Sequence, residues 1–222
     1  MLSKRLMTLA NLVPEHSNIV DVGCEHALLD IYLTLNKKVK CIATDINENS
    51  IKVAKENINK YKLSNSITLI KTSGLQNINT NDIDTIIIAG MGTSSILKIL
   101  KNHYFNTLII QSNNDIEELR RKIIPKGYII QNEEIVYERK KYYIIINFVK
   151  GYKKYKNIDY FIGPIIRLNK RTIDHQYINY LLNIHNELLK RIPKKCIVSR
   201  LYIRYKKRIL QNIIGKKLDL RY

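Results

Sequence analysis

Two carboxylates and a glycine stand close together near the start of the sequence, in the segment Asp21-Val22-Gly23-Cys24-Glu25-His26. Gly23 would let the backbone approach a ligand closely, and the helix expected to follow would offer unpaired N–H groups to an anion. The segment is not a G-x-G-x-x-G dinucleotide motif, because Glu25 and Leu28 occupy the later glycine positions. The charge of Glu25 would repel a pyrophosphate, whereas Asp21 and Glu25 together would attract an ammonium group.

A third acid, Asp45, indicates a nucleoside ligand. It ends the second predicted strand 24 residues after Asp21, near where nucleoside-binding Rossmann folds place an acid that accepts hydrogen bonds from ribose hydroxyls. Together with the preference for an ammonium group, this favours S-adenosylmethionine over NAD. Two structural explanations stay open: a tight turn with a capping acid for Asp21 and Glu25, and a helix N-cap for Asp45.

Two further loops are expected at the same edge of the sheet, because each follows a buried strand. The first, Ala89-Gly90-Met91-Gly92, has two glycines that permit close approach of a flat base and expose backbone carbonyls to its exocyclic amine. The second, Gln111-Ser112-Asn113, brings amide side chains near such a base. Tight turns also use glycine, and Gln111 and Asn113 could instead form a polar cap for the helix near Asp115.

His26 is the histidine best placed for chemistry. It follows the first strand, so it could orient a substrate or take up a proton near the transferred methyl group. A hydrogen-bonded turn residue is an equally good explanation. The remaining histidines have no partner pattern and are expected to be structural or surface residues: His16, His103, His175 and His185.

These residues need a sheet that brings several strand ends to one edge. The first two thirds of the sequence alternate apolar runs with amphipathic segments, which predicts a parallel sheet with right-handed crossovers. The expected strands are Ile19–Val22, Val39–Thr44, Ile67–Lys71, Thr85–Ala89 and Thr107–Gln111, and the expected helices are Ala27–Leu35, Ser50–Tyr61, Ser94–Lys101 and Ile116–Ile124. Two β-rich runs, Tyr128–Tyr137 and Tyr142–Val149, predict a terminal antiparallel hairpin. This α/β pattern is typical of the Rossmann-like class I methyltransferase sheet, whereas dehydrogenases usually end in a sixth parallel strand.

From about residue 165 the sequence is expected to be helical. Apolar residues at three- and four-residue spacing predict a coiled-coil-like helical hairpin, with one helix ending near Pro193 and the other near Gly215. The predicted stripes are Ile173, Tyr177, Leu181, Ile184, Leu188 and Ile192, then Val198, Tyr202, Tyr205, Ile209 and Ile213. The expected domains are a cofactor-binding methyltransferase domain, residues 1–164, and a small basic helical hairpin, residues 165–222, which binds tRNA.

The charge balance indicates a polyanionic partner. The sequence has 38 lysines and arginines against 19 acidic residues, a net charge of +19, and clustered cations bind phosphates by releasing counterions. An AT-rich coding bias would also raise the lysine content, but it does not by itself give such an excess of cations. The cysteines Cys24, Cys41 and Cys196 are far apart, which argues against a zinc site or disulfide framework and favours a reducing cytoplasm. No apolar run approaches the roughly 20 residues of a membrane span, so no membrane partner is expected.

Several segments together resemble the bacterial tRNA (adenine-22-N1)-methyltransferase family: Leu2-Ser-Lys-Arg-Leu6, Asp21-x-Gly-x-Glu-His-Ala27, Ile88-Ala-Gly-Met-Gly92, Gln111-x-Asn113 and Gly163-Pro164. The match covers residues 1–168 in order and spacing, and the helical hairpin is similar in kind to that family's coiled-coil C-terminal domain. The sequence departs from the family at Ser73, which replaces the Asp of Gly-Asp-Gly-Leu, and at Ser112, which replaces the Pro of Gln-Pro-Asn. A contact to the cofactor's adenine amine would then become a hydroxyl contact at Ser73.

The resemblance implies methyl transfer from S-adenosylmethionine to N1 of adenine 22 in the D-arm region of bacterial tRNA, with S-adenosylhomocysteine as the product and no metal. The expected cofactor-binding residues are Asp21, Gly23, Glu25, His26, Asp45, Ile46, Ser73, Gly74, Ala89 and Gly90. The residues expected at the target base are His26, Gly90, Met91, Gln111 and Asn113. The residues expected to bind RNA phosphates are Lys4, Arg5, Arg167, Arg200, Arg204, Lys207 and Arg208. We expect a cytoplasmic monomer; the alternative is an RNA-binding protein with a catalytically inactive Rossmann-like domain.

Overall fold

The computed structural model describes residues 2–169 and 171–218, which form two compact units. The first unit extends to Lys154 and the second begins at Tyr155. The boundary predicted from the sequence lies ten residues later, between residues 164 and 165. In the described part of the chain, every helix is too short or too polar to cross a membrane.

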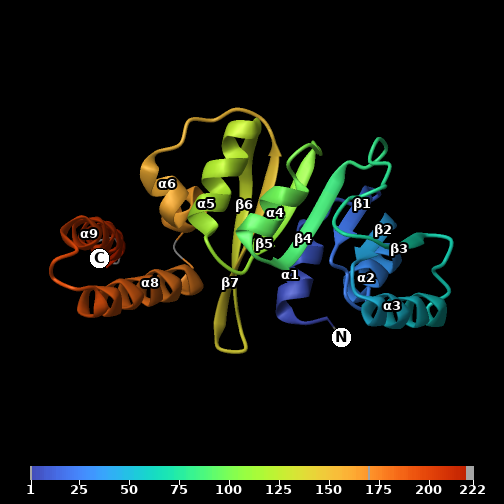
Figure 1. The fold of residues 1–222 in the computed structure, drawn as a ribbon, viewed down its shortest axis with the longest axis horizontal. Helices are drawn as coiled ribbons and strands as arrows, with labels where there is room; N and C mark the ends of the chain where they lie inside the picture. Colours follow the sequence, from blue (N-terminus) through green and yellow to red (C-terminus); the bar gives the residue numbers. More distant parts are fainter. Residues whose placement is uncertain (1, 170, 219–222) are drawn as a thin grey trace. The chain divides into compact units, whose positions relative to one another are not determined.

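The first unit is built on a sheet that has seven strands within the described residues, in the order β3-β2-β1-β4-β5-β7-β6 (Figure 1). The first five strands along the chain are parallel, and β7 runs antiparallel to both β5 and β6. The strands are β1 (Asn18–Val22), β2 (Lys40–Asp45), β3 (Ile67–Lys71), β4 (Thr85–Met91), β5 (Thr107–Ser112), β6 (Tyr128–Glu138) and β7 (Lys141–Lys150). The predicted Rossmann-like sheet with a terminal antiparallel hairpin is confirmed.

Apolar runs explain why β4 and β5 lie in the middle of this sheet. Ile86, Ile87 and Ile88 of β4 have no exposed surface, and Ile109 and Ile110 of β5 are equally buried. Consecutive buried residues on one strand require cover on both faces of the sheet, as in parallel α/β folds. The covering helices are α1 (Lys4–Leu12), α2 (Leu28–Lys37), α3 (Glu48–Lys60), α4 (Thr93–Ile99) and α5 (Ile116–Ile123), with the 3₁₀ turn η1 (Ile124–Lys126) before β6.

Helix α1 joins the beginning of the unit to its end. The Ser3 side chain caps the helix by accepting a hydrogen bond from the Leu6 amide. Leu9 and Ala10 are fully buried in the same apolar cluster as Val136 of β6 and Ile145 of β7. The first helix is therefore held on the terminal hairpin, at the edge where the parallel strands end.

The second unit is helical, as predicted. Its helices are α6 (Asn157–Ile162), α7 (Pro164–Leu168), α8 (Thr172–Arg191) and α9 (Ile197–Leu218). Helices α8 and α9 pack against each other; Figure 1 shows α8 from the side and α9 nearly end-on, so they cross at a steep angle. The prediction that the last helix ends near Gly215 is wrong, because α9 continues through that glycine to Leu218.

The predicted apolar stripe of α9 is wrong in its first half. Tyr202 and Tyr205 are 52% and 57% exposed, and Val198 is 81% exposed. Lys206 lies nearer the packed side, with its ammonium nitrogen 4.5 Å from the ring centroids of both Phe161 and Tyr202. A lysine can occupy a position on the packed side of the helix because its ammonium group interacts favourably with the faces of the two aromatic rings. Apolar periodicity predicts only hydrophobic side chains there.

The stripe predicted for α8 is displaced in a similar way. Leu188, a predicted member, is 39% exposed, whereas Ile178 and His185 are buried. His185 Nδ1 lies 2.7 Å from the Leu181 carbonyl oxygen, and burial lowers the pKa of the imidazole. This histidine is structural, as the sequence analysis expected.

Candidate active site

The carboxyl ends of β1, β2 and β4 enclose a cavity of about 430 Å³. It brings together most of the residues predicted for the cofactor and the base, which come from loops far apart in the sequence. Its lining includes Asp21, Gly23, Glu25, His26, Asp45, Ala89, Gly90, Met91 and Asn113, together with Arg5 and Tyr143. Tyr143 was not predicted as a site residue, because it is one of several tyrosines in this part of the sequence and carries no local signal.

The turn after β1 has a constrained backbone. Gly23, Glu25 and Ala27 all have positive φ angles, 85°, 53° and 55°. The amides of Gly23 and Cys24 both donate to the Thr44 carbonyl oxygen, at 2.8 and 2.9 Å, which ties the turn to β2. Helix α2 has no side-chain cap, so the explanation of this segment as a turn with a capping acid is wrong.

Asp45 is held in the cavity wall by two backbone amides. Its Oδ2 accepts a hydrogen bond from the Glu25 amide at 3.0 Å, and its Oδ1 accepts from the Asn47 amide at 2.8 Å. Asn47 is the N-cap of α3, because its side chain accepts from the amides of Asn49 and Ser50. The explanation of Asp45 as the helix cap is therefore wrong, and its carboxylate connects the end of β2 to the Asp21–His26 turn.

Buried acids lie beneath this turn. Asp21 is 5% exposed, and burial together with the carboxylates of Asp30 and Asp45 raises its pKa well above the usual range, while Arg5 lowers it. Asp30 is fully buried, and burial raises its pKa to about 6. A hydrogen bond from the Cys41 thiol to Asp30 Oδ1 acts in the opposite direction and lowers the pKa. A cavity with this much carboxylate at its floor favours a cationic ligand.

A second cavity of about 510 Å³ adjoins the first and shares Gly23, Asp45 and Met91 with it. Met91 lies on the turn: a Cβ atom placed on Gly23 would be only 2.7 Å from Met91 Cε. The second cavity is lined by the remaining residues predicted for the cofactor, Ile46, Ser73 and Gly74. His103, which the sequence analysis treated as structural or surface, also lines it.

Gln111 is the centre of a hydrogen-bond network on the other side of the first cavity. Its side chain is fully buried, and its Oε1 accepts from Arg5 Nη1 at 2.9 Å and from the Gly90 amide at 3.1 Å. Its Nε2 donates to Asn113 Oδ1 at 3.1 Å, and Asn113 Nδ2 donates to the Gly90 carbonyl at 2.6 Å. Neither amide caps α5, whose N-cap residue Asp115 has no side-chain cap bond, so that alternative is wrong.

Arg5 belongs to this network as well as to α1. Its guanidinium carbon lies 5.6 Å from the centroid of the Tyr143 ring, and its backbone amide donates to Glu138 Oε2 at 3.3 Å. The predicted phosphate-binding arginine therefore lies inside the candidate site, where it holds Gln111. Helix α1, at the beginning of the first unit, and the β6–β7 hairpin, at its end, meet at this point.

The chain matches known methyltransferases over most of its length. The methyltransferase domain family matches residues 2–146. The tRNA (adenine(22)-N(1))-methyltransferase of Bacillus subtilis is 33% identical over 151 residues, which are 65% of this chain and 63% of that enzyme. The structure of M. capricolum TrmK with S-adenosyl-homocysteine is 30% identical, covers 97% of this chain and 98% of that chain, and has a TM-score of 0.87. The chain belongs to the bacterial tRNA (adenine(22)-N(1))-methyltransferase family.

The cavities of this methyltransferase fit S-adenosylmethionine. Gly23 is a position that a Cβ atom would fill, and Asp21 and Glu25 line the same cavity, where an ammonium group would lie beside them. Asp45 lies between the two cavities, where a ribose would present its hydroxyls, and Ser73 and Gly74 line the far cavity. Among residues 2–169 and 171–218, no group of three or more His, Cys, Asp or Glu side chains could hold a metal ion.

His26 lies at the exposed rim of the site. Its side chain is 46% exposed, and its Nε2 is 3.9 Å from Glu25 Oε1. Its backbone carbonyl accepts a hydrogen bond from Asn57 Nδ2 at 3.0 Å, which fixes the turn to α3. A role in orienting the substrate and a role in the turn are both compatible with this position.

The residues predicted to bind RNA phosphates differ in their contacts and in their exposure. Arg167 forms a 2.8 Å ion pair with Asp159, and Arg200 Nη1 donates to the carbonyls of Leu189 and Ile192 at the end of α8. These two arginines hold the helical unit together. The others are Lys4, Arg204 and Arg208, which are exposed, and Lys207, which is half-buried.

Proposed function

We propose that this methyltransferase transfers a methyl group from S-adenosylmethionine to N1 of adenine 22 in tRNA. The observation that carries the proposal is that the same cavity is lined by Asp21 and Glu25 and by the Gly90 loop and Asn113. This combination supports a cofactor site beside a loop that receives a flat base. The substrate follows the names of the relatives: the B. subtilis enzyme is a tRNA (adenine(22)-N(1))-methyltransferase.

The cofactor would occupy both cavities. Its amino-acid end would lie against Asp21, Gly23 and Glu25, and its nucleoside against Asp45 and the residues of the second cavity. Bound S-adenosylmethionine supplies an electrophilic methyl group on a positively charged sulfur. The carboxylates in the cavity floor stabilise a bound cation, because opposite charges interact strongly where water is excluded.

The target adenine would lie against the Gly90 loop. Adenine N1 has an in-plane lone pair, so it attacks the methyl carbon directly, and the site needs no strong base. As the N1–CH₃ bond forms, the bond between the methyl carbon and sulfur would break, so S-adenosylhomocysteine leaves with a neutral thioether sulfur and the positive charge passes to the methylated base. The residues of this chain would position the two reactants. Gln111 and Asn113 hydrogen-bond the Gly90 loop, and Arg5 in turn holds Gln111. Met91 limits the space next to Gly23.

Transfer of labelled methyl to unmodified tRNA, followed by mapping of the modified nucleotide, tests the reaction. We expect label at adenine 22 and none on a tRNA with guanine at that position. Absence of label from every tRNA, with tRNA binding retained and no thermal shift on addition of S-adenosylmethionine, would instead support the alternative of an inactive RNA-binding protein.

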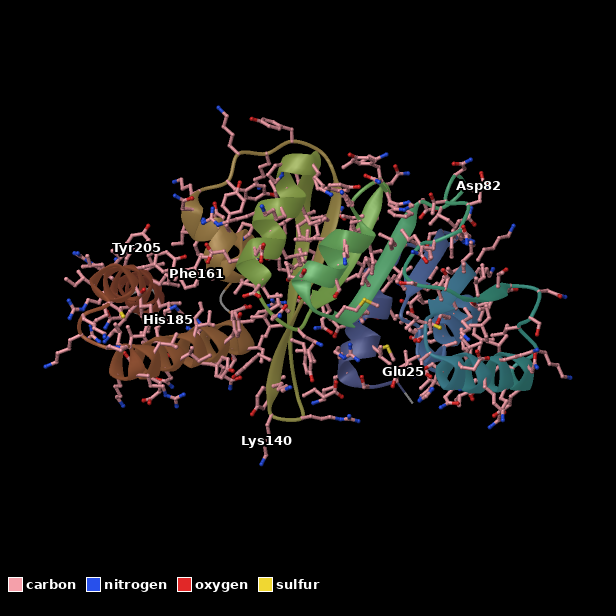
Figure 2. All side chains as sticks on the ribbon, viewed as in Figure 1. Glu25, Asp82, Lys140, Phe161, His185 and Tyr205 are labelled. Atoms are coloured by element: carbon pink, nitrogen blue, oxygen red, sulfur yellow. The ribbon has the colours of Figure 1, made fainter. Side chains whose placement is uncertain are left out.

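Asp45→Ala tests the cofactor site. We expect its affinity for S-adenosylmethionine to fall about tenfold or more, because a hydrogen-bonded carboxylate is lost and the Glu25 amide loses its acceptor. Asp82→Ala is the matched control: it removes an exposed acid that Figure 2 shows at the opposite end of the unit from Glu25. Equal affinities for the two variants, measured by calorimetry, would contradict the assignment.

Three further parts of the proposal rest on the sequence. Lys4, Arg204, Lys207 and Arg208 are proposed to bind tRNA phosphates, which single charge-removing variants would test by their tRNA affinity. The methyltransferase is proposed to be monomeric, which light scattering would test. A cytoplasmic location is proposed from the three separate cysteines.

A further inference from the structure

The β6–β7 hairpin continues past the end of β5, at the edge of the sheet that holds the candidate site. The register pairs Gln111 of β5 with Ile145 of β7, and pairing between β6 and β7 continues from there to Glu138 and Lys141. A strand rises about 3.4 Å per residue, so the four further residues of β7 extend the hairpin by about 14 Å. We call this extension, residues 135–144, the hairpin finger.

The finger lies beside the cavity. Tyr143 is part of the finger and of the cavity lining, and Arg5 lies between its ring and Gln111. Figure 2 shows Lys140 at the end of the finger, projecting past the same edge at which Glu25 lies. A nucleic acid with one base in the cavity would therefore pass along the finger.

The tip of the finger is positively charged. Arg139, Lys140 and Lys141 are consecutive and exposed, and in the described part of the chain none of the three has an ion-pair partner. Three neighbouring cations that face water repel one another, so they do not stabilise the hairpin. They are available to phosphates.

The backbone of the turn allows these two cations to be removed without disturbing the fold. Arg139 and Lys140 form a two-residue turn with φ angles of 50° and 61°, both in the left-handed region. Asn-Gly is the pair that such hairpin turns favour, because glycine and asparagine adopt this conformation with little strain. The chain instead places two long cationic side chains at these positions.

Two tyrosines lie next to the charged tip. Tyr137 is 49% exposed, and its ring centroid is 4.7 Å from that of Tyr142 on the opposite strand. Exposed aromatic rings beside cations are the combination that binds single-stranded nucleic acid, because bases stack on the rings while cations hold the backbone.

Electrostatics at the cavity explain why such a surface is needed. Glu25 and Asp45 line the cavity, and their carboxylates repel the phosphates on either side of a bound nucleotide. We propose that the hairpin finger binds the phosphate backbone of tRNA next to the nucleotide that is methylated. This inference rests on the proposed function for the identity of the nucleic acid.

The double substitution Arg139→Asn with Lys140→Gly tests the finger without endangering the fold. It removes both cations and installs the pair that the turn favours, so the melting temperature should stay the same or rise. The matched control is Lys60→Asn with Lys62→Gly. Lys62 is an exposed cation with φ 57°, and both control residues lie where α3 ends before β3, at the opposite edge of the sheet.

For the finger variant we expect the KM for tRNA and the Kd for tRNA to rise about tenfold. Each lost phosphate contact lowers the dependence of log Kd on log salt concentration by about 0.7 to 0.9, so the loss of two contacts should lower the slope by roughly 1.4 to 1.8. The kcat at saturating tRNA and the affinity for S-adenosylmethionine should stay within twofold of wild type. The control variant should match wild type in all five quantities.

The outcomes separate this inference from the proposed function. If the wild type methylates tRNA and the finger variant keeps the wild-type KM and salt dependence, the finger does not bind tRNA. If the finger and control variants lose tRNA affinity equally, the effect is one of net charge and the inference is overturned. If the wild type transfers no methyl group to tRNA, the proposed function fails, while tRNA Kd values measured without cofactor still decide whether the finger binds RNA.

Discussion

Replacing Gln111 with methionine is the most direct perturbation of the substrate side of the site. Methionine keeps the length and flexibility of the side chain, so packing changes little, but three hydrogen bonds are lost. The bonds to the Gly90 amide and to Asn113 contribute about 1 kcal/mol each, and the bond from the partly exposed Arg5 contributes about as much after discounting for solvent. The total is about 3 kcal/mol.

This total divides between folding and catalysis. We expect the free energy of unfolding, measured by urea denaturation, to fall by about 1 to 2 kcal/mol, because Gly90 and Arg5 can regain hydrogen bonds with water. The remainder is the cost of losing order in the Gly90 loop, and it raises the activation free energy of methyl transfer. An increase of about 1.4 kcal/mol corresponds to a tenfold lower kcat/KM for tRNA. Single-turnover methylation should show this loss, with the affinity for S-adenosylmethionine changed less than threefold.

Gln111→Glu is the companion variant. It keeps an oxygen that accepts from Arg5 and Gly90 but opposes Asn113 Oδ1, so it should retain more activity than Gln111→Met. A Gln111→Met enzyme with a kcat/KM within twofold of wild type would refute the idea that this network positions the loop.

Two other predictions concern the cofactor side. Gly23→Ala should lower both stability and S-adenosylmethionine affinity, because it adds a left-handed strain of about 1 to 2 kcal/mol and a contact 2.7 Å from Met91 Cε; Gly127→Ala, with φ +91° and open space around it, should lose stability alone, and equal cofactor affinities would refute the contact. Asp30 has its folded pKa raised from 3.8 to about 6, so the folded state binds more protons and stability falls as pH rises from about 4 to 6. Asp30→Asn keeps an oxygen for the Cys41 thiol and should remove this fall, raising the free energy of unfolding at pH 7 by about 1 to 3 kcal/mol. Identical urea-denaturation profiles against pH for the variant and wild type would count against a buried, titrating Asp30.

The sequence predicted the sheet well because its strands carry their own evidence. The isoleucine runs of β4 and β5 are too apolar and too short for anything except buried strands, and the structure places both at the centre. The site residues that follow these strands were predicted for the same reason: parallel strands end at one edge. Chain order and strand ends were enough to bring Asp21, Asp45 and Gly90 together.

Partners far apart in the sequence were harder to predict. Arg5 was expected to bind phosphates because it stands next to Lys4 in the sequence. No neighbouring residue indicates that its partner is the buried side-chain amide of Gln111. Its contact with Gln111 depends on α1 packing against the terminal hairpin, and a single sequence does not reveal which segments pair. Choices between neighbouring polar residues were also beyond local patterns: Asp45 and Asn47 both suit an N-cap, and only the backbone of the structure distinguishes them.

The contact between α1 and the terminal hairpin sets an order of assembly. The Arg5 amide and Glu138 are 133 residues apart, so this hydrogen bond closes almost the whole first unit into a loop. Closing such a loop carries a large entropic cost, and contacts this distant form late in folding. During synthesis the Asp21–His26 turn, β2 and β4 are complete long before β7 leaves the ribosome. The half of the site that binds the cofactor can therefore take shape first, and the half that receives the base must wait for the last strand.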